Sequence, residues 1–519
     1  MRAIDLYSGI GGWTLGMKLA GIENIASFEW WNEANFTHNI NFDTDHGEKN
    51  IREIDVTTDL NFNKKINFVV GSPPCTQFSF ANRGGNGDIQ DGLIDIHKFL
   101  EVVDHLKPKY WAMENVPRVA KILEKELNGS LKKFKHLVKV IIIVDCSDYG
   151  VPQSRKRMIA GNFPVELFNS YKEKISKKTL GEVITALSKD PVIDPNYGYK
   201  LDRNKVTELE NEANLTLEEE RINRDSKTFH PVYNSMSFPE RLDRPSRTIT
   251  ATCTRVSRES VIVKSKNGYR RLNVRERGVV QGFPITYQFY GKSLSAKFKM
   301  IGNAVPPILT YYLFQGMLET KLADLTFPSQ SLYKHPIPHL PAFKSKLSLH
   351  IPKYSLERKF QFAVPNLRFG SGVRFELSNV PKGSELQWSF KFFYGNSKNI
   401  KEVNLDSKMK KMLAPIVNTT HNEIFTECAE KIADQFQKVN SKSLQKIWTS
   451  PKTNVEAFEF LDKVGESVNV ILNSASFESV KNELLVSILQ ETNKKLIENR
   501  EKLVTGFYFL STLNSKMFK

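Results

Sequence analysis

The sequence has few cysteines: four in 519 residues, at positions 75, 146, 253 and 428. They are widely spread, and the absence of a CxxC pair or a cysteine and histidine cluster argues against a zinc site and against a disulfide framework. No run approaches the roughly 18 apolar residues of a membrane span, and the first residues do not resemble a secretory leader. We therefore expect a soluble, reduced, cytoplasmic protein that binds no metal.

Charge of one sign is in excess. The formal net charge is +17, which is more than solubility requires. Clustered lysine and arginine favour a polyanionic partner, most simply nucleic acid, although a lysine-rich surface that only keeps the protein dispersed would produce the same total. At 519 residues, 40% of them hydrophobic, the chain is expected to form two or three packed domains.

The first residues read as a strand, a glycine-rich turn and a helix. The apolar segment Ala3–Tyr7 is followed by Ser8–Trp13, which contains three glycines, and by the helical pattern Thr14–Ala20. This is the front of a nucleotide-binding βαβ unit, in which glycines let the backbone approach a ligand at a helix N-terminus. A plain turn is the alternative. Because the spacing is not GxGxxG, an adenosine-bearing cofactor other than NAD is favoured.

Two further segments are expected to supply cofactor contacts. A second strand, Ile25–Phe28, is followed by Glu29, which can accept from ribose hydroxyls, and by Trp30, whose indole can cover an adenine. A third strand is expected over residues 51–56, with Asp55 at its end as an acceptor for an adenine amino group. Acidic residues that are merely solvated at strand ends are the alternative.

Cys75 stands in an unusual place. The apolar strand pattern Ile66–Val70 leads into GSPPCTQFS at residues 71–79, so the thiol follows two prolines at the end of a strand. A structural cysteine would suit the apolar run better. A nucleophile, a metal ligand and a passive loop residue are the three interpretations, and a thiolate is strongly nucleophilic even as a minor species.

At this point the chain resembles the cytosine-5 DNA methyltransferase family. DLYSGIGGW at residues 5–13 looks like the cofactor motif of that family, and GSPPCTQFS like its Pro-Cys motif. The resemblance continues in order through MENV at 113–116, QSRKR at 153–157, RE at 275–276 with QGFP at 281–284, and GNAVPP at 302–307. It covers about residues 1–325, and nothing is recognised beyond them.

The resemblance implies an α/β, Rossmann-like S-adenosylmethionine-dependent methyltransferase domain with an inserted target-recognition domain. Cys75 would add to C6 of cytosine, which activates C5 toward a sulfonium methyl group, while Glu114 binds N3 and Arg155 the ring carbonyl, with Arg157 helping to hold the site. The residues implied to bind S-adenosylmethionine are Tyr7, Ser8, Gly9, Ile10, Gly11, Gly12, Glu29, Trp30, Asp55, Val56, Pro74, Asn303 and Ala304.

A cytosine inside a duplex cannot be reached at C6, so a DNA substrate implies base flipping. Residues 80–87 are expected to form a lid over the extruded base. Thr76 follows the nucleophile where the family usually has glutamine, which leaves the role of that position open. The residues expected to contact DNA are Thr76, Gln77, Arg83, Thr250, Arg255 and Arg258.

The expected domains are a catalytic domain at 1–165 and 288–326, a target-recognition domain at 166–287, a linker at 327–344 and a C-terminal extension at 345–519. Alternating apolar residues predict strands at 345–394, and a helical pattern follows from Ser407, which makes the extension α+β. Its function is open between DNA contact, a protein partner and a brace for the catalytic domain.

Double-stranded DNA is the expected substrate, with the protein acting as a monomer in a modification or restriction-modification context, at the nucleoid if prokaryotic. A tRNA cytosine-5 methyltransferase is one alternative. Its members carry Cys-Phe-Thr where this chain has Thr252, Cys253 and Thr254, so DNA is favoured. A catalytically inactive DNA-binding relative is another, and the presence of Cys75, Glu114 and Arg155 argues against it.

Overall fold

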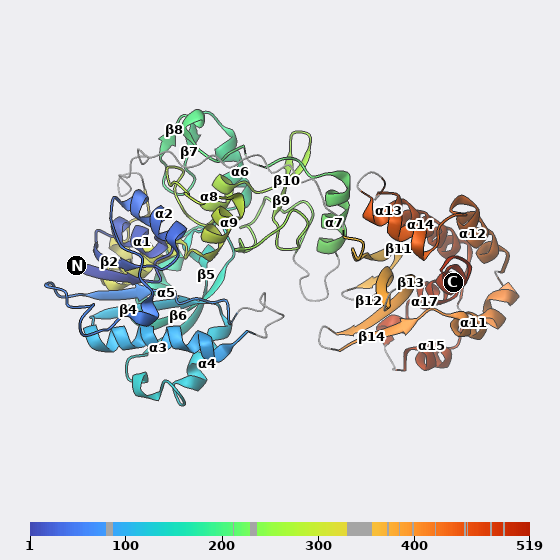
Figure 1. Ribbon diagram of the computed structural model, residues 1–519, viewed down its shortest axis with the longest axis horizontal. Helices are drawn as coiled ribbons and strands as arrows, with labels where there is room; N and C mark the ends of the chain where they lie inside the picture. The colour runs from blue at the N-terminus through green and yellow to red at the C-terminus, as the bar shows by residue number, and fades with distance from the viewer. Residues whose placement is uncertain are drawn as a thin grey trace. The chain divides into compact units, whose positions relative to one another are not determined.

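In the computed structural model the chain forms two compact units, Met1–Asn214 with Pro239–Ser348, and Leu215–Phe238 with Leu349–Lys519 (Figure 1). The structure describes residues 1–78, 87–210, 212–228, 236–329, 355–370, 373–382, 385–396, 399–420, 422–450, 453, 455–477, 480–490 and 494–518. The expected linker at 327–344 lies almost entirely outside these described residues.

A sheet of six strands, among the described residues, forms the centre of the first unit in the order β2-β1-β3-β4-β6-β5. Neighbouring strands run parallel from β2 to β4, whereas β6 is antiparallel to both β4 and β5. The strands are β1 (Arg2–Leu6), β2 (Glu23–Phe28), β3 (Phe68–Gly71), β4 (Tyr110–Asn115), β5 (Val140–Asp145) and β6 (Lys156–Asn162). The expected Rossmann-like α/β fold is confirmed.

Alternate strand residues enter two separate cores, as the period of two in a strand requires. Ala3 and Phe68 pack in a core with helices α1 (Gly12–Leu19) and α10 (Pro307–Met317). Their neighbours in the sequence pack in a second core with α3 (Ile89–Leu106) and α4 (Arg118–Glu126). Helix α10, the last α-helix described in this unit, ends at Met317.

The turn after β1 is packed against a distant part of the chain. A Cβ on Gly12 would lie 2.1 Å from the carbonyl oxygen of Val305, and one on Gly16 would lie 2.2 Å from Oγ1 of Thr310. Trp13 meets Phe314 of α10 edge to face, with ring centroids 5.9 Å apart. These glycines therefore let α1 approach the segment at 304–311, which brings the first and last motifs of the unit together.

Residues 51–56 do not form the expected third strand. A 3-10 turn, Ile51–Glu53, is present instead, and the side chain of Asn50 caps it by accepting from the backbone N–H of Arg52. Ile51 and Ile54 are buried and the residues between them are exposed. A spacing of three between buried residues suits a helical turn, whereas a strand would bury alternate residues.

The region between the QSRKR and RE motifs has little regular structure. Its described elements in the first unit include helix α6 (Leu180–Ser188), the hairpin of β7 (Val192–Ile193) and β8 (Lys200–Leu201), and the hairpin of β9 (Ile262–Ser265) and β10 (Gly268–Arg271). Helix α8 (Val274–Val280) follows, with Asn273 and Glu276 forming a capping box at its start.

Helix α7 (Leu217–Thr228) falls within the residues expected to form the recognition domain, yet it belongs to the second unit. Arg221 binds Asp462 of α14 (Val455–Ser474) through both terminal nitrogens, with the shorter distance 2.6 Å. Glu218 pairs with Arg358, and Ile222 packs on the apolar core of the unit. The C-terminal extension is therefore completed by a segment from the middle of the chain.

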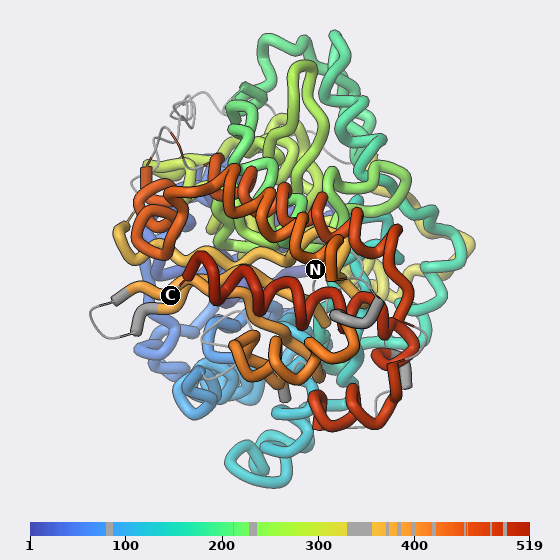
Figure 2. The backbone as a smooth tube through the Cα atoms, turned by 90° about the vertical axis from the view of Figure 1, so that its right-hand side faces the viewer, coloured from blue at the N-terminus to red at the C-terminus, as the bar shows by residue number. Residues whose placement is uncertain are grey.

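The second unit contains an antiparallel sheet of four strands, β11 (Gln361–Gly370), β12 (Val373–Lys382), β13 (Glu385–Asn396) and β14 (Asn399–Asn404). Helices α13 (Ser441–Thr449), α14 and α17 (Arg500–Met517) pack against it, as Figure 2 shows, and Phe375, Phe392 and Phe507 join sheet to helix in one aromatic core. The other helices are α11 (Ser407–Thr420), α12 (Asn422–Gln435), α15 (Asn482–Leu489) and α16 (Lys494–Ile497). The expected α+β extension is confirmed.

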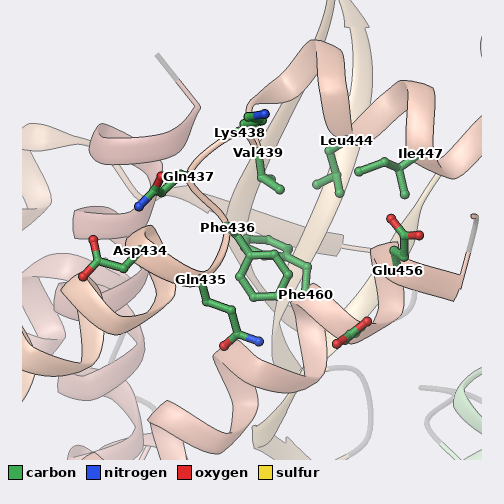
Figure 3. A pocket seen from close by; sticks show the side chains of 11 residues that line it. Asp434, Gln435, Phe436, Gln437, Lys438, Val439, Leu444, Ile447, Glu456 and Phe460 are labelled. Atoms are coloured by element: carbon green, nitrogen blue, oxygen red, sulfur yellow. The ribbon is translucent and has the colours of Figure 1, made fainter.

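A hollow of about 400 Å³ opens in this unit between the end of α12, helix α13 and the start of α14 (Figure 3). Its apolar part is formed by Phe436, Leu444, Ile447 and Phe460, and Glu456 lies at its edge. Phe460 is fully buried, whereas Glu456 is exposed. The hollow thus combines an apolar floor with a solvated acidic rim.

Replacing Arg221 should weaken the second unit. Arg221→Ala removes the partner of Asp462 and a cation–π contact with Phe458, whose ring centroid lies 5.4 Å from the guanidinium. We expect the free energy of unfolding of this unit to fall by about 1–2 kcal/mol, since the pair is only partly exposed. Urea denaturation followed by tryptophan fluorescence measures it, with Lys442→Ala, an exposed lysine of helix α13 in the same unit, as the control. Equal losses in both variants would contradict the specific role of Arg221.

Candidate active site

The strand order brings three motifs to one edge of the sheet. The carboxyl ends of β1, β3 and β4 meet there, since Leu6 pairs with Gly71 and Gly71 with Met113. Because β6 runs antiparallel to β4, its first residues lie beside the last residues of β4, as the pairing of Asn115 with Met158 shows. Cys75, Glu114 and Arg157 are thereby gathered from segments that are far apart in the sequence.

Glu114 and Arg157 form a buried ion pair. The Nε of Arg157 lies 2.8 Å from Oε1 of Glu114, and the side chains are only 12% and 7% exposed. A terminal nitrogen of Arg157 also donates to the carbonyl oxygen of Lys156, at 2.7 Å. A buried carboxylate is retained only with such a partner, so the arginine holds the Glu114 side chain at the edge of the sheet.

The segment that carries Cys75 is tied down on both sides. The side-chain amide of Asn115 donates to the carbonyl oxygen of Pro73 at 3.0 Å, and the N–H of Phe78 donates to the carbonyl oxygen of Cys75 at 3.0 Å. Burial raises the pKa of the Cys75 thiol, the positive charge of Arg157 lowers it, and Glu114 raises it. The thiol, the carboxylate and the guanidinium therefore act on one another.

Arg155 does not lie as expected. Its side chain is buried, and its terminal nitrogens donate to three backbone carbonyls: Ile249 at 3.0 Å, Gly302 at 2.8 Å and Ala304 at 3.4 Å. Burial lowers its pKa to about 9, with the nearby charge of Arg157 adding to the shift. A guanidinium committed to these carbonyls does not fit the expected contact with a ring carbonyl. The second arginine of the motif, Arg157, stands beside Glu114 instead.

The turn after β1 presents groups suited to S-adenosylmethionine. Glu29, buried at the end of β2, accepts from the N–H of Gly9 at 2.9 Å and from those of Trp30 and Trp31 at 2.9 and 2.7 Å. Burial raises its pKa. The hydroxyl of Ser8 is buried with no hydrogen-bond partner among the described residues. A Cβ placed on Gly9 would meet no atom within 4 Å apart from its neighbours in the chain. Trp30 is 64% exposed. These residues fit an adenosine-bearing group.

The other expected cofactor residues differ in their exposure and fall into three groups. Ile10, Gly11, Gly12 and Ala304 are buried, and a Cβ on Gly11, which has a φ of 86°, would lie 2.9 Å from the ring of His38. Asp55 is exposed and caps its own turn by accepting from Thr57. Asn303 is exposed, and Tyr7, Val56 and Pro74 are half-buried.

Two of the residues expected to contact DNA are engaged within the protein. Arg255 is buried and binds Glu212 at 3.3 Å and the carbonyl oxygen of Asn214 at 2.6 Å. Gln77 binds the start of α3 through both ends of its amide. Thr76 and Arg258 are exposed, and Thr250 is half-buried. Arg83 and most of the expected lid at 80–87 lie outside the described residues.

The sequence reasoning missed a pair of glutamines that join the motifs. Gln153 donates to the side chain of Gln281 at 2.6 Å and accepts from the N–H of Ile249 at 2.7 Å. Gln281 in turn donates to the carbonyl oxygen of Ala304. Both glutamines are fully buried, and their positions within the QSRKR and QGFP motifs were the only signal that the sequence offered.

Comparison with known proteins shows what residues 1–319 are similar to. The family model of C-5 cytosine-specific DNA methylases matches residues 1–319. Type II methyltransferase M.FnuDI of Fusobacterium nucleatum is 29% identical over 345 residues, which cover 62% of this chain and 95% of that protein. M.HindV of Haemophilus influenzae is 30% identical over 337 residues, covering 61% and 96%. The crystal structure of S. pombe Dnmt2 methyltransferase covers 62% of this chain and 98% of its own, with a TM-score of 0.44 and 17% identity.

No group of three or more metal-binding side chains occurs among the residues that the structure describes. Within the same part of the chain, no helix is long and apolar enough to cross a membrane.

The reactivity of Cys75 should follow its charged neighbours. Its alkylation by iodoacetamide should rise with pH, with a midpoint above the roughly 8.5 of an unperturbed cysteine, because burial disfavours the thiolate. Arg157→Gln removes the cation and should raise the midpoint further, whereas Glu114→Gln removes an anion and should lower it. Mass spectrometry of the peptide that contains Cys75 measures both. Shifts in the same direction for the two variants would contradict this arrangement, and the urea-unfolded protein gives the reference midpoint.

Proposed function

The chain belongs to the C-5 cytosine-specific DNA methylase family and is a DNA cytosine-5 methyltransferase, and we propose that it acts through a covalent bond between Cys75 and C6 of a flipped cytosine. The resemblance expected from the motifs is thus confirmed for residues 1–319. The observation that carries the mechanism is the assembly of Cys75, Glu114 and Arg157 at one edge of the sheet.

Each of the three residues has a distinct role in the proposal. The Cys75 sulfur adds to C6, and the electron pair of the C5–C6 double bond becomes available at C5. Glu114 binds the ring at N3, which makes the addition easier. Arg157, rather than Arg155, donates to the ring carbonyl, because its guanidinium lies beside Glu114 and is 12% exposed. Once C5 carries the methyl group, its proton passes to a base or to water and the C5–C6 double bond re-forms. The bond between C6 and the Cys75 sulfur breaks at the same time, which releases the methylated cytosine and the thiolate.

S-adenosylmethionine supplies the methyl group when it is bound. Glu29 would hold the ribose hydroxyls, Trp30 would cover the adenine, and Ser8 and Gly9 would face the rest of the molecule. The buried carboxylate of Glu29, the buried hydroxyl of Ser8 and the open space at Gly9 support this assignment. Tyr7, Val56, Pro74 and Asn303 would complete the pocket.

Double-stranded DNA is the substrate class that the family implies, and base flipping follows because C6 is inaccessible in a duplex. Thr76, Thr250 and Arg258 are the residues proposed to contact DNA, since they are exposed or half-exposed. Restriction-modification is the proposed context, which the Type II relatives support. Action as a monomer, in the cytoplasm or at the nucleoid of a prokaryote, and contact of the C-terminal unit with DNA or a protein partner belong to the same proposal.

Transfer of labelled methyl groups tests the function. The wild type should label mixed-sequence duplex DNA, and Cys75→Ala should reduce labelling to background, because the proposed mechanism activates C5 through the bond between this sulfur and C6. Bulk tRNA is incubated in parallel. Label in tRNA alone would move the enzyme to the RNA-modifying branch, and label that persists in Cys75→Ala would refute the covalent mechanism. Cys428→Ala, which removes a buried thiol of the second unit, is the matched control.

Replacing each of the two arginines of the QSRKR motif should affect a different property, the rate of methyl transfer for one and the melting temperature for the other. Arg157→Lys should slow methyl transfer at saturating substrates by about a hundredfold to a thousandfold, with little change in melting temperature, because it loses a donor to the reacting ring. Arg155→Lys should lower the melting temperature, since buried carbonyls lose their partners. Single-turnover rates and calorimetry measure the two effects. An Arg155→Lys variant with normal melting and the larger loss of rate would reverse the assignment.

A further inference from the structure

The first turns of α3 anchor the segment that follows the nucleophile. Gln77, two residues after Cys75, donates from Nε2 to Oδ2 of Asp91 at 3.0 Å and accepts on Oε1 from the N–H of Asp88 at 3.0 Å. A Cβ on Gly87 would lie 2.2 Å from the carbonyl oxygen of Gln77, so the backbone is in close contact there as well. One amide thus joins residue 77 to the residues that open the helix.

The same turns of α3 anchor the cofactor side of the site. The hydroxyl of Tyr7, in the turn after β1, donates to Oδ1 of Asp95 at 3.2 Å. Arg52, three residues before Asp55, donates to Oδ2 of Asp95 at 2.7 Å and to Oδ1 of Asp91 at 2.8 Å. A continuous chain of polar contacts therefore runs from Tyr7 through Asp95, Arg52 and Asp91 to Gln77.

This series of polar contacts is buried at the end near Tyr7 and more exposed toward Gln77. Asp95 is 6% exposed, and burial together with its charge raises the pKa of Tyr7. Arg52 and Asp91 are 35% and 37% exposed, and the arginine beside Asp91 lowers the pKa of that carboxyl. Each carboxylate has the same guanidinium as its partner, so a shift of Arg52 changes both contacts together.

Resting on the proposed function, we propose that Gln77 is a positioning residue that couples occupancy of the cofactor site to the placement of Cys75. Movement of the turn at Tyr7 or of the segment at Arg52 on binding is transmitted through Asp91 to Gln77, which holds the residues after the nucleophile. By linkage, loosening Gln77 must also weaken cofactor binding.

A double-mutant cycle between Tyr7→Phe and Gln77→Ala tests the coupling. Tyr7→Phe removes only the hydroxyl, so the fold is retained. Each variant should lower the first-turnover rate at saturating DNA and cofactor by about tenfold and weaken binding of S-adenosylmethionine a few fold. If the two residues acted independently, the losses of rate in the single variants would multiply in the double variant. We expect the loss of rate in the double variant to be about fivefold smaller than that product. Losses that multiply in both measurements would overturn the proposal.

Exchange of donor and acceptor gives a second test. Gln77→Glu alone places two carboxylates against each other and should slow methyl transfer. Gln77→Glu combined with Asp91→Asn restores one donor and one acceptor, so the double variant should recover most of the rate. A merely structural role would not predict this recovery, and failure to recover counts against the coupling. Gln90→Ala, an exposed glutamine one position from Asp91, is the matched control and should leave both measurements unchanged.

A readout that needs no methyl transfer separates the two proposals. Alkylation of Cys75 should become a few fold faster in Gln77→Ala, because the segment is released, and Tyr7→Phe should shift it in the same direction. If the wild type binds no S-adenosylmethionine and labels no nucleic acid, the proposed function fails while the alkylation still tests the coupling. If the wild type is active and Tyr7→Phe leaves alkylation unchanged, the coupling fails and the function stands.

Discussion

The buried ion pair between Glu114 and Arg157 is the constraint on which the site depends. Two side chains from neighbouring antiparallel strands share one edge of the sheet, and neither can be buried there without the other. Cys75 lies within the field of both charges, so the reactivity of the thiol is set by their balance. The arrangement exists because β6 enters the sheet against the direction of β4, which puts the start of one strand next to the end of the other.

The frame behind this pair is made of backbone contacts rather than of reacting groups. Arg155 and Gln281 donate to carbonyl oxygens of the segments at 249 and 302–304, and Gln153 accepts from the N–H of Ile249. Gly12 allows helix α1 to approach Val305. Most of the family motifs are therefore explained by close packing between distant segments.

The C-terminal unit has a fold of its own, but its sequence is not contiguous. Helix α7 leaves the region between the motifs and joins the second unit through Arg221 and Glu218. The second unit therefore consists of the C-terminal residues together with helix α7. The hollow near Phe460 lies outside the residues matched by the family model, which end at 319.

The sequence by itself determined the family, the α/β fold and the expectation that Cys75 and Glu114 share a site, because strand patterns and ordered motifs depend on local residue types. It could not separate Arg155 from Arg157, nor show that Arg255 is buried, since an arginine has the same appearance in a sequence whether it meets a carbonyl, a carboxylate or a phosphate. It also predicted a strand at 51–56, where the spacing of Ile51 and Ile54 favoured a helical turn. The partner of each arginine and the conformation of residues 51–56 depend on tertiary packing, because contacts between distant segments determine which groups are buried together.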